Sequence, residues 1–267
     1  DPREKLRALR AEFALKAQML NYELARPMFE SFRVNKGRAT GVIQWMLNAA
    51  WPKMYWQLYD WFLMPTGAFY GVKKACEPLQ LVYHYGDASI RLVNDTQKDT
   101  KDLVADVRVY DIESNLFLAA HLPITSERVF ELPQFRTIST TYFLSLGLSD
   151  CLGNALASNF YWLSTRPDVL NYQAKVKPWE YYTPSREYAD LIGLNSLRPA
   201  QVDVSCHIDK NGQIAVNLAN RSGGIAFFIE LLLIDEDAGE PVVPVFWQDN
   251  YVSLLPGEAL TITARAE

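Results

Sequence analysis

The spacing of apolar residues predicts a long helix at the start of the chain. Between Leu6 and Met28 these residues recur at steps of three and four, which is the period of an amphipathic helix with one buried face. The stripe consists of Leu6, Leu9, Phe13, Ala17, Leu20, Leu24 and Met28. We expect a helix over about residues 4–34 that is kinked at Pro27, ends at Lys36-Gly37 and packs its stripe on a partner surface.

A different pattern follows the predicted helix. Residues 40–47 form a nearly continuous apolar run, as expected for a strand buried on both faces of a parallel sheet, and a second helix-like segment covers about 51–63. A single strand with a helix on each side cannot satisfy its backbone hydrogen bonds or cover both of its faces. The start of the chain therefore resembles an α/β sheet or barrel that is cut near its C-terminal end, with the missing strands supplied from elsewhere.

After Pro78 the pattern changes to short alternating runs separated by turn-forming residues, which is typical of β-sandwiches. The runs of a first sandwich lie at 79–85, 89–94, 103–110, 116–121, 142–148 and 160–163. A weakly patterned stretch rich in Tyr and Pro then covers 178–199. The runs of a second, smaller sandwich lie at 201–208, 213–220, 226–234, 242–246, 251–255 and 260–265.

The resulting organisation is α/β followed by all-β, in three domains. We place their limits at 1–75, 76–177 and 178–267. Within the last domain, Lys210-Asn211-Gly212 is a strong signal for a hairpin turn between two strands. The chain lacks an initiator Met and a signal pattern, and the predicted helix begins within its first few residues, so we expect the chain to be an excerpt from a longer polypeptide.

Composition excludes several classes of function. The formal net charge of -5 and the lack of a basic block disfavour nucleic acid as a partner. The longest apolar stretches, such as 227–234, are much shorter than the roughly 18 residues needed to span a bilayer, so no membrane anchor is expected. Cys76, Cys151 and Cys206 lack the spacing of a zinc site; we expect buried small hydrophobic residues, although one disulfide stays open.

Four stretches carry a resemblance to a known family. They are Gly41–Pro52 with the following Leu58-Tyr59-Asp60, Tyr70–Leu79, Phe160–Ser164 and Pro244–Glu258. The first resembles the last barrel strand and following loop of the exo-β-D-glucosaminidase and β-mannosidase branch of glycoside hydrolase family two. The other three favour the exo-β-D-glucosaminidase members. The resemblance implies the last helix-strand-helix portion of a TIM barrel followed by two immunoglobulin-like β-sandwich domains.

The resemblance also implies where catalysis occurs. Members of the family retain the anomeric configuration with two barrel glutamates, a general acid and base and a nucleophile, whose carboxyl groups lie roughly 5 Å apart. Both precede the last barrel helix, so we expect them before Asp1 and expect no catalytic residue in this chain. Glu12, Glu23 and Glu30 fall within the predicted helix as solvated or packing residues, and Glu77 has no partner carboxylate nearby in sequence. Alone, the chain should not hydrolyse a glycoside.

The candidate substrate-binding residues are Trp45, Asn48 and Trp51, because active sites of TIM barrels lie at the C-terminal ends of the strands. Trp45 resembles the tryptophan beneath the sugar in the family's innermost subsite, and a flat indole suits the apolar face of a pyranose. Asn48 offers both donors and an acceptor to sugar hydroxyls. Ala49-Ala50 stands where mannosidase-like relatives often carry an acidic residue, so the identity of the sugar stays open.

Each of these residues also has a structural interpretation. Without the resemblance, Trp45 is better explained as a core aromatic residue of a buried strand. Trp51, Trp56 and Trp61 could form a sugar-binding wall, yet their spacing also fits a helix that packs on its barrel. The stretch around Trp247 could reach toward the catalytic opening, but turn chemistry and core packing explain it equally well.

We therefore interpret the chain as the C-terminal part of a retaining glycoside hydrolase that removes β-linked glucosamine or mannose from non-reducing ends. Its partners would be the upstream catalytic barrel portion, in the same polypeptide or as another subunit, and an oligosaccharide substrate. Neither a cofactor nor a metal is implied, and polysaccharide-degrading relatives imply a secreted or periplasmic location. The alternative is a non-catalytic tandem β-sandwich module for carbohydrate binding or scaffolding.

Overall fold

The computed structural model describes residues 2–38, 41–52, 57–96, 102–180, 182–210 and 212–266. The chain forms two compact units. Unit 1 contains Asp1–Pro78, His84–Gly86 and Pro199–Glu267, and unit 2 contains Leu79–Tyr83 and Asp87–Arg198. Both ends of the sequence thus belong to one unit, while the three predicted domain limits stay a prediction.

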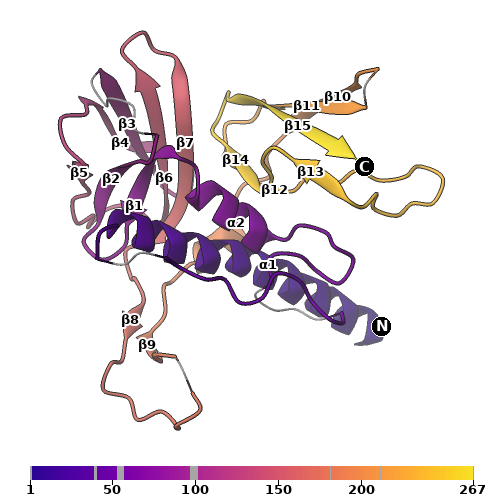
Figure 1. Ribbon diagram of the computed structural model, residues 1–267, viewed down its shortest axis with the longest axis horizontal. Helices are drawn as coiled ribbons and strands as arrows, with labels where there is room; N and C mark the ends of the chain where they lie inside the picture. Colours follow the sequence, from indigo (N-terminus) through magenta and orange to yellow (C-terminus); the bar gives the residue numbers. More distant parts are fainter. Residues whose placement is uncertain are drawn as a thin grey trace. The chain divides into compact units, whose positions relative to one another are not determined.

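The long first helix is confirmed. Helix α1 runs from Pro2 to Val34 and continues through Pro27 as one ribbon (Figure 1). The partner surface that we expect for its apolar stripe is not supplied by the described residues of this chain. The stripe residues described as exposed are Leu6, Leu9, Phe13, Leu20, Leu24 and Met28.

The buried side of α1 is a different one, formed by Tyr22, Ala25, Arg26 and Glu30. Its neighbour is helix α2 (Gly67–Ala75), which the apolar pattern did not reveal because the helix is short and rich in small residues. A Cβ atom placed on Gly71 would lie 2.7 Å from the backbone oxygen of Tyr22. Glycine at this position therefore allows the two helices to approach closely.

Two predicted elements between the helices are wrong. Residues 41–47 form no strand, and neither 51–52 nor 57–63 is helical; Trp56 lies outside the described residues. Within the described residues, the segment pairs through isolated bridges, between Asn48 and Tyr59 and between Tyr59 and Pro65. A strand needs a neighbour along its length to satisfy its backbone groups, and the described residues pair with this segment at its end, around Asn48.

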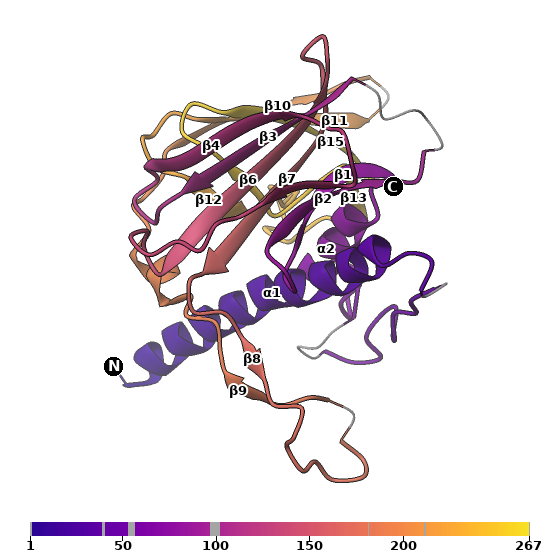
Figure 2. The same ribbon diagram turned by 90° about the vertical axis from the view of Figure 1, so that its left-hand side faces the viewer.

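Unit 2 is built on two antiparallel sheets, as predicted (Figure 2). The three-stranded sheet has the order β1-β2-β5 and the four-stranded sheet the order β4-β3-β6-β7. The bounds are β1 Leu79–His84, β2 Ser89–Asn94, β3 Leu103–Tyr110, β4 Leu116–Pro123, β5 Arg128–Glu131, β6 Thr141–Asp150 and β7 Ala155–Ser164. Alternate residues of β3, such as Ala105, Val107 and Val109, are fully buried in the core of this unit.

The weakly patterned stretch contains a small hairpin and a turn of 3-10 helix. Strands β8 (Val169–Leu170) and β9 (Ser185–Glu187) pair antiparallel, and the 3-10 helix η1 covers Ile192–Ser196. Figure 2 shows the hairpin and its loop extending away from the sheets of unit 2.

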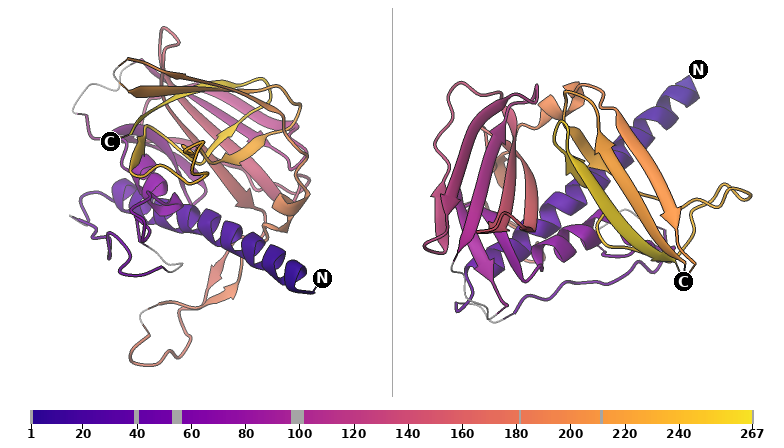
Figure 3. Two further views of the ribbon diagram at one scale, coloured as in Figure 1. Left: turned by 90° about the vertical axis from the view of Figure 1, so that its right-hand side faces the viewer. Right: turned by 90° about the horizontal axis from the view of Figure 1, so that it is seen from above.

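The C-terminal strands of unit 1 form the second predicted sandwich, drawn in orange to yellow in Figure 3. One sheet has the order β10-β11-β15-β13, and β12 pairs with β14. The bounds are β10 Val202–Ile208, β11 Gln213–Asn220, β12 Ala226–Ile229, β13 Val245–Trp247, β14 Val252–Leu254 and β15 Ala259–Ala266. The predicted hairpin is confirmed, because β10 pairs with β11 from Val202 and Asn220 to Ile208 and Ile214.

The cysteine prediction is wrong. Cys76, Cys151 and Cys206 are free and exposed, because they lie at a helix end, in a hairpin turn and on the edge strand β10. In the described ranges, no group of three or more His, Cys, Asp or Glu side chains is placed to hold a metal ion. No helix in those ranges is both long and apolar enough to cross a membrane.

Candidate functional site

The predicted substrate-binding residues lie on one exposed segment, residues 41–52. Trp45 is 73% exposed and Trp51 is 61% exposed, and Asn48 is exposed as well. The interpretation of Trp45 as a core residue therefore does not hold within this chain. The exposed indoles and the Asn48 amide can all reach a ligand, which is what their predicted role requires.

Backbone pairing holds this segment in place. The Tyr59 N–H donates to the Leu47 carbonyl at 2.9 Å, and the Ala49 N–H donates to the Tyr59 carbonyl at 3.3 Å. Asn48 thus sits between two backbone hydrogen bonds to one residue. The peptide bond between Trp45 and Met46 is cis.

The pairing residue Tyr59 is itself fixed by a tight turn. Asp60 accepts hydrogen bonds from the N–H groups of Phe62, at 2.8 Å, and Met64, at 2.9 Å. Its own N–H donates to the Met64 carbonyl at 3.0 Å. Trp61 and Phe62 are exposed on this turn. The helical packing considered for Trp61 is therefore not formed here, and the turn presents Trp61 and Phe62 to solvent.

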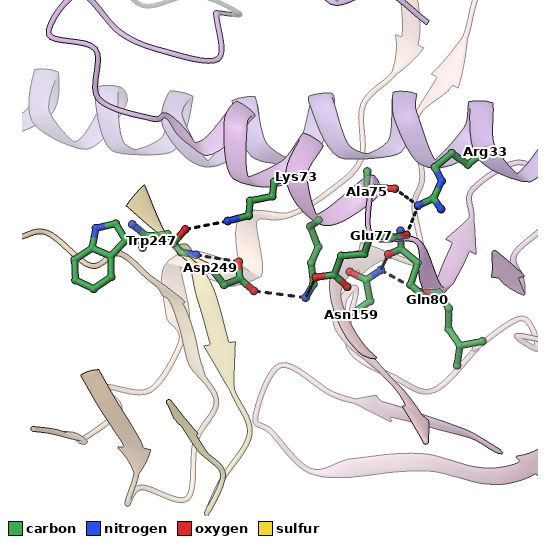
Figure 4. A network of polar contacts seen from close by, with 11 residues as sticks. Arg33, Lys73, Ala75, Glu77, Gln80, Asn159, Trp247 and Asp249 are labelled. Carbon is green, nitrogen blue, oxygen red and sulfur yellow. Dashed lines mark hydrogen bonds and ion pairs between the residues drawn. The ribbon is translucent and has the colours of Figure 1, made fainter. Parts of the chain in front are cut away.

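Helix α2 begins directly after this turn and is anchored to the C-terminal sandwich (Figure 4). The Lys73 ammonium donates to the Trp247 carbonyl at 2.9 Å. Lys74 forms ion pairs with Glu77, at 3.0 Å, and with Asp249, at 3.5 Å. Burial alone would lower the pKa of Lys74, but the Asp249 and Glu77 carboxylates outweigh it and raise that pKa. Lys74 is thus held charged at this junction.

The same C-terminal end of α2 is also held by α1. Arg33 donates to the carbonyl oxygens of Ala75, at 2.5 Å, and Glu77, at 2.6 Å (Figure 4). The last carbonyl groups of a helix have no partner within it, so an arginine at this position satisfies them. The C-terminal end of α2 is therefore held from two sides within unit 1, by the C-terminal sandwich and by α1.

A row of aromatic rings runs alongside these polar contacts. Ring centroids are 5.2 Å apart for Tyr59 and Phe69, 5.1 Å for Phe69 and Tyr70, and 5.7 Å for Tyr70 and Tyr251. Burial raises the pKa of Tyr70 to about 12. The row connects the turn beside the candidate site with the C-terminal sandwich, and no periodic pattern of residues predicts it.

Two of the family-like stretches serve packing. Trp247 is buried, and the buried Asn250 side chain donates to the Leu231 carbonyl at 2.9 Å and accepts from the Leu231 N–H at 2.7 Å. In unit 2, Tyr161 and Trp162 of β7 are buried. Of the two explanations offered for the stretch around Trp247, core packing is the one the contacts support.

The glutamates of α1 include one buried charge cluster. Arg26 is fully buried and pairs with Glu23 at 2.8 Å, and the Glu30 side chain is buried one turn further on. The Tyr85 hydroxyl also donates to Glu23. Burial raises the pKa of Glu23 despite the neighbouring Arg26 guanidinium. Because an arginine lies with these carboxylates, their arrangement is that of an ion pair network.

Comparison with known proteins finds one family model in the C-terminal part of the chain and relatives that match most of its length. Residues 180–267 match the family model described as the exo-β-D-glucosaminidase Ig-fold domain. The exo-β-D-glucosaminidase of Amycolatopsis orientalis is 37% identical over 95% of this chain, and that of Arthroderma benhamiae is 35% identical over 94%. The chain is thus similar to exo-β-D-glucosaminidases over most of its length.

Solved structures of an exo-β-D-glucosaminidase relative support the fold. The exo-chitosanase of Amycolatopsis orientalis, in complex with PNP-β-D-glucosamine, has a TM-score of 0.83 at 36% identity, covering 94% of this chain and 31% of that one. This chain spans 26% and 29% of the two exo-β-D-glucosaminidases from Amycolatopsis orientalis and Arthroderma benhamiae. The similarity lies in the C-terminal quarter to third of these relatives.

Proposed function

We propose that this chain is the accessory C-terminal portion of a retaining exo-β-D-glucosaminidase. It would supply one wall of the sugar site through Trp45, Asn48 and Trp51 and hold that wall in place with its C-terminal sandwich. The observation that carries the proposal is the 37% identity with an exo-β-D-glucosaminidase over 95% of this chain and 26% of the relative. The two catalytic glutamates would belong to the upstream barrel portion.

The exposed stripe of α1 supports a partner of this kind. Phe13 is 64% exposed and lies among other exposed apolar residues spaced at three and four along the helix. An apolar stripe of this length is normally covered in a folded protein. We propose that the rest of a (β/α)8 barrel covers it, and that residues 41–47 become a strand when barrel neighbours lie on both sides.

Glucosamine is the sugar that we favour over mannose. Both relatives cited above are named for glucosaminidase activity, and one related structure was solved with a β-D-glucosamine derivative. A polysaccharide substrate also favours a secreted or periplasmic protein.

The proposal is tested on protein from its native source, by native mass and by mass spectrometry of everything that co-migrates. We expect peptides from upstream of Asp1 in the same particle, and release of glucosamine with retained β configuration from chitosan oligosaccharides. This 267-residue chain alone should be inactive on the same substrate. A native particle consisting of this chain alone would overturn the proposal, as would hydrolysis by the isolated chain.

A further inference from the structure

We infer that Lys73 and Asp249 are positioning residues. By fixing helix α2 on the C-terminal sandwich, they determine where the Trp45–Asn48 segment lies. The inference rests on the proposed function and adds residues that do not themselves touch a sugar. It follows from three consecutive sets of contacts, all within unit 1.

The first set fixes helix α2 on the C-terminal sandwich. Lys73 donates to the backbone of Trp247 at 2.9 Å, and Asp249 pairs with Lys74 at 3.5 Å. Asp249 also accepts from the N–H of Asn250 at 2.9 Å, so its carboxylate is oriented by its own loop. Burial lowers the pKa of Lys73, against the influence of Asp249. Both lysines of α2 therefore contact the same short loop of the sandwich.

The second set transmits this placement to the turn before α2. The Thr66 hydroxyl donates to the carbonyls of Gln57 and Leu58, each at 3.0 Å, and the Thr66 N–H donates to Leu58 at 2.9 Å. The Tyr59 ring packs on Phe69 of α2. A shift of α2 must therefore move residues 57–59 with it.

The third set joins this turn to the candidate site. Tyr59 makes both backbone hydrogen bonds that hold Leu47 and Ala49, on either side of Asn48. Trp45 itself is largely exposed, so side-chain packing fixes it poorly and its position depends on this backbone pairing. Loosening α2 should then cost affinity for the sugar without removing any group that contacts it.

The test compares Lys73→Met with Lys73→Arg in the complete protein. Methionine keeps the apolar stem but loses the donor to Trp247, whereas arginine keeps a donor. Losing one hydrogen bond corresponds to a loss of about two- to tenfold in kcat/KM. We expect Lys73→Met to raise KM more than it lowers kcat, and Lys73→Arg to restore most of the loss. Asp249→Asn should act in the same direction.

A double-mutant cycle tests whether Lys73 affects activity through the Trp45 segment. If Lys73 acts through the Trp45 segment, Lys73→Met should have a smaller effect in a Trp45→Ala background than in the wild type. Hydrogen exchange supplies a readout that is independent of activity. The amides of Tyr59 and Ala49 should exchange faster in Lys73→Met, while those of β11 and β15 keep their protection.

The outcomes separate the inference from the proposed function. Additive effects of the two substitutions, or unchanged exchange at Tyr59 and Ala49, would overturn the positioning role. If Trp45→Ala leaves kcat/KM unchanged, the assignment of Trp45 to the sugar site fails. In that case, faster amide exchange at Tyr59 in Lys73→Met would still support the inference that Lys73 stabilises the backbone pairing of Tyr59.

Discussion

Trp45 combines wide exposure with a fixed backbone, and this combination makes it informative to replace. Its indole is open to solvent, while the residues after it are paired with Tyr59. Removing an exposed ring creates no cavity, so stability should hardly change. Any large effect on activity would then arise from contact with the substrate.

We expect Trp45→Ala in the complete enzyme to lower kcat/KM at least about tenfold, as for a tryptophan that dominates a binding contact. The thermal midpoint should stay close to that of the wild type. Phe62→Ala is the matched control, because Phe62 is also exposed but lies on the neighbouring turn. Steady-state kinetics on chitosan oligosaccharides would check this, and loss of soluble protein instead would assign Trp45 to the core.

Arg26 presents the opposite case, a charge with no exposure at all. Arg26→Met removes the cation beside Glu23 and Glu30, and an uncompensated buried carboxylate costs about 3 kcal/mol or more of unfolding free energy. Urea unfolding at pH 7 would measure it. Arg10→Met, at an exposed position of the same helix, should be nearly neutral.

The unfolding free energy that Arg26→Met loses should depend on pH in a definite direction. The pKa of Glu23 is raised in the folded state, so its protonated form is the better tolerated one. The stability that this group contributes is present below its ordinary pKa of 4.5 and is lost as the pH rises through the folded value. Because methionine removes the compensating cation, the deficit of Arg26→Met should shrink at pH 4. A deficit that grows on acidification would contradict this.

Individual site residues could be predicted only where chemistry and motif coincided. Trp45, Asn48 and Trp51 were chosen for their types and their place in a family-like stretch, and the structure presents all three as exposed. Lys73 and Asp249 could not be found in this way. They are 176 positions apart in the numbering, and only the packed helix brings Lys73 to the loop that carries Asp249.

At the scale of elements, the packing of α2 against α1 depends on glycine. Gly71→Ala should gain about 1 kcal/mol from helix propensity, but its Cβ would lie 2.7 Å from the Tyr22 backbone oxygen. Overpacking typically costs about 1–3 kcal/mol, and a backbone atom cannot turn aside as a side chain can. We therefore expect a net loss of stability by thermal unfolding. Gly223→Ala is the control, since a Cβ atom there meets nothing within 4 Å.

The turn between β6 and β7 should respond to acid. Asp150 accepts hydrogen bonds from the Asn154 side chain, at 2.8 Å, and from the Asn154 and Leu152 backbone, and these bonds lower its pKa below the ordinary 3.8. Because folding lowers its pKa, the Asp150 carboxylate stabilises the protein above pH 3.8. This stabilisation is lost as the pH falls through the pKa of Asp150 in the folded state.

Asp150→Ala should therefore lower the thermal midpoint at pH 6, and the difference from the wild type should narrow on acidification below pH 3.8. Asp237→Ala controls for loss of an exposed negative charge elsewhere. A difference that is constant with pH would show that the Asp150 carboxylate is not the group responsible.

Most of the β-strands were predictable, because an alternating pattern records which face of a strand is buried by its own domain. The runs at 89–94, 103–110 and 213–220 coincide with β2, β3 and β11. The start of the chain was harder, because its apolar pattern describes surfaces that residues of this chain do not cover. The stripe of α1 is exposed among the described residues, and residues 41–47, predicted as a buried strand, are largely exposed and form no strand.

At the scale of the whole molecule, the open stripe of α1 should dominate solution behaviour. We expect this chain alone to associate as its concentration rises, because exposed apolar patches of this kind drive contacts between copies. Leu9→Ser/Phe13→Ser/Leu24→Ser should reduce the association, as measured by sedimentation. Glu12→Ser/Lys16→Ser, which removes an exposed ion pair of the same helix, should not. A strictly monomeric wild-type chain would contradict the prediction.

The division of unit 1 into distant parts of the sequence has a consequence for synthesis on the ribosome. Helices α1 and α2 are made first, but the residues that pack on them, including Phe228 and Tyr251, are made only after all of unit 2. Unit 2 can fold while the chain is still growing. The side of α1 that is buried in the folded unit 1 stays exposed until the last strands have been synthesised. A premature stop codon shortly before Ala226 would therefore remove both Phe228 and Tyr251, and Tyr22 and Tyr70, far away in the sequence, would lose these ring contacts.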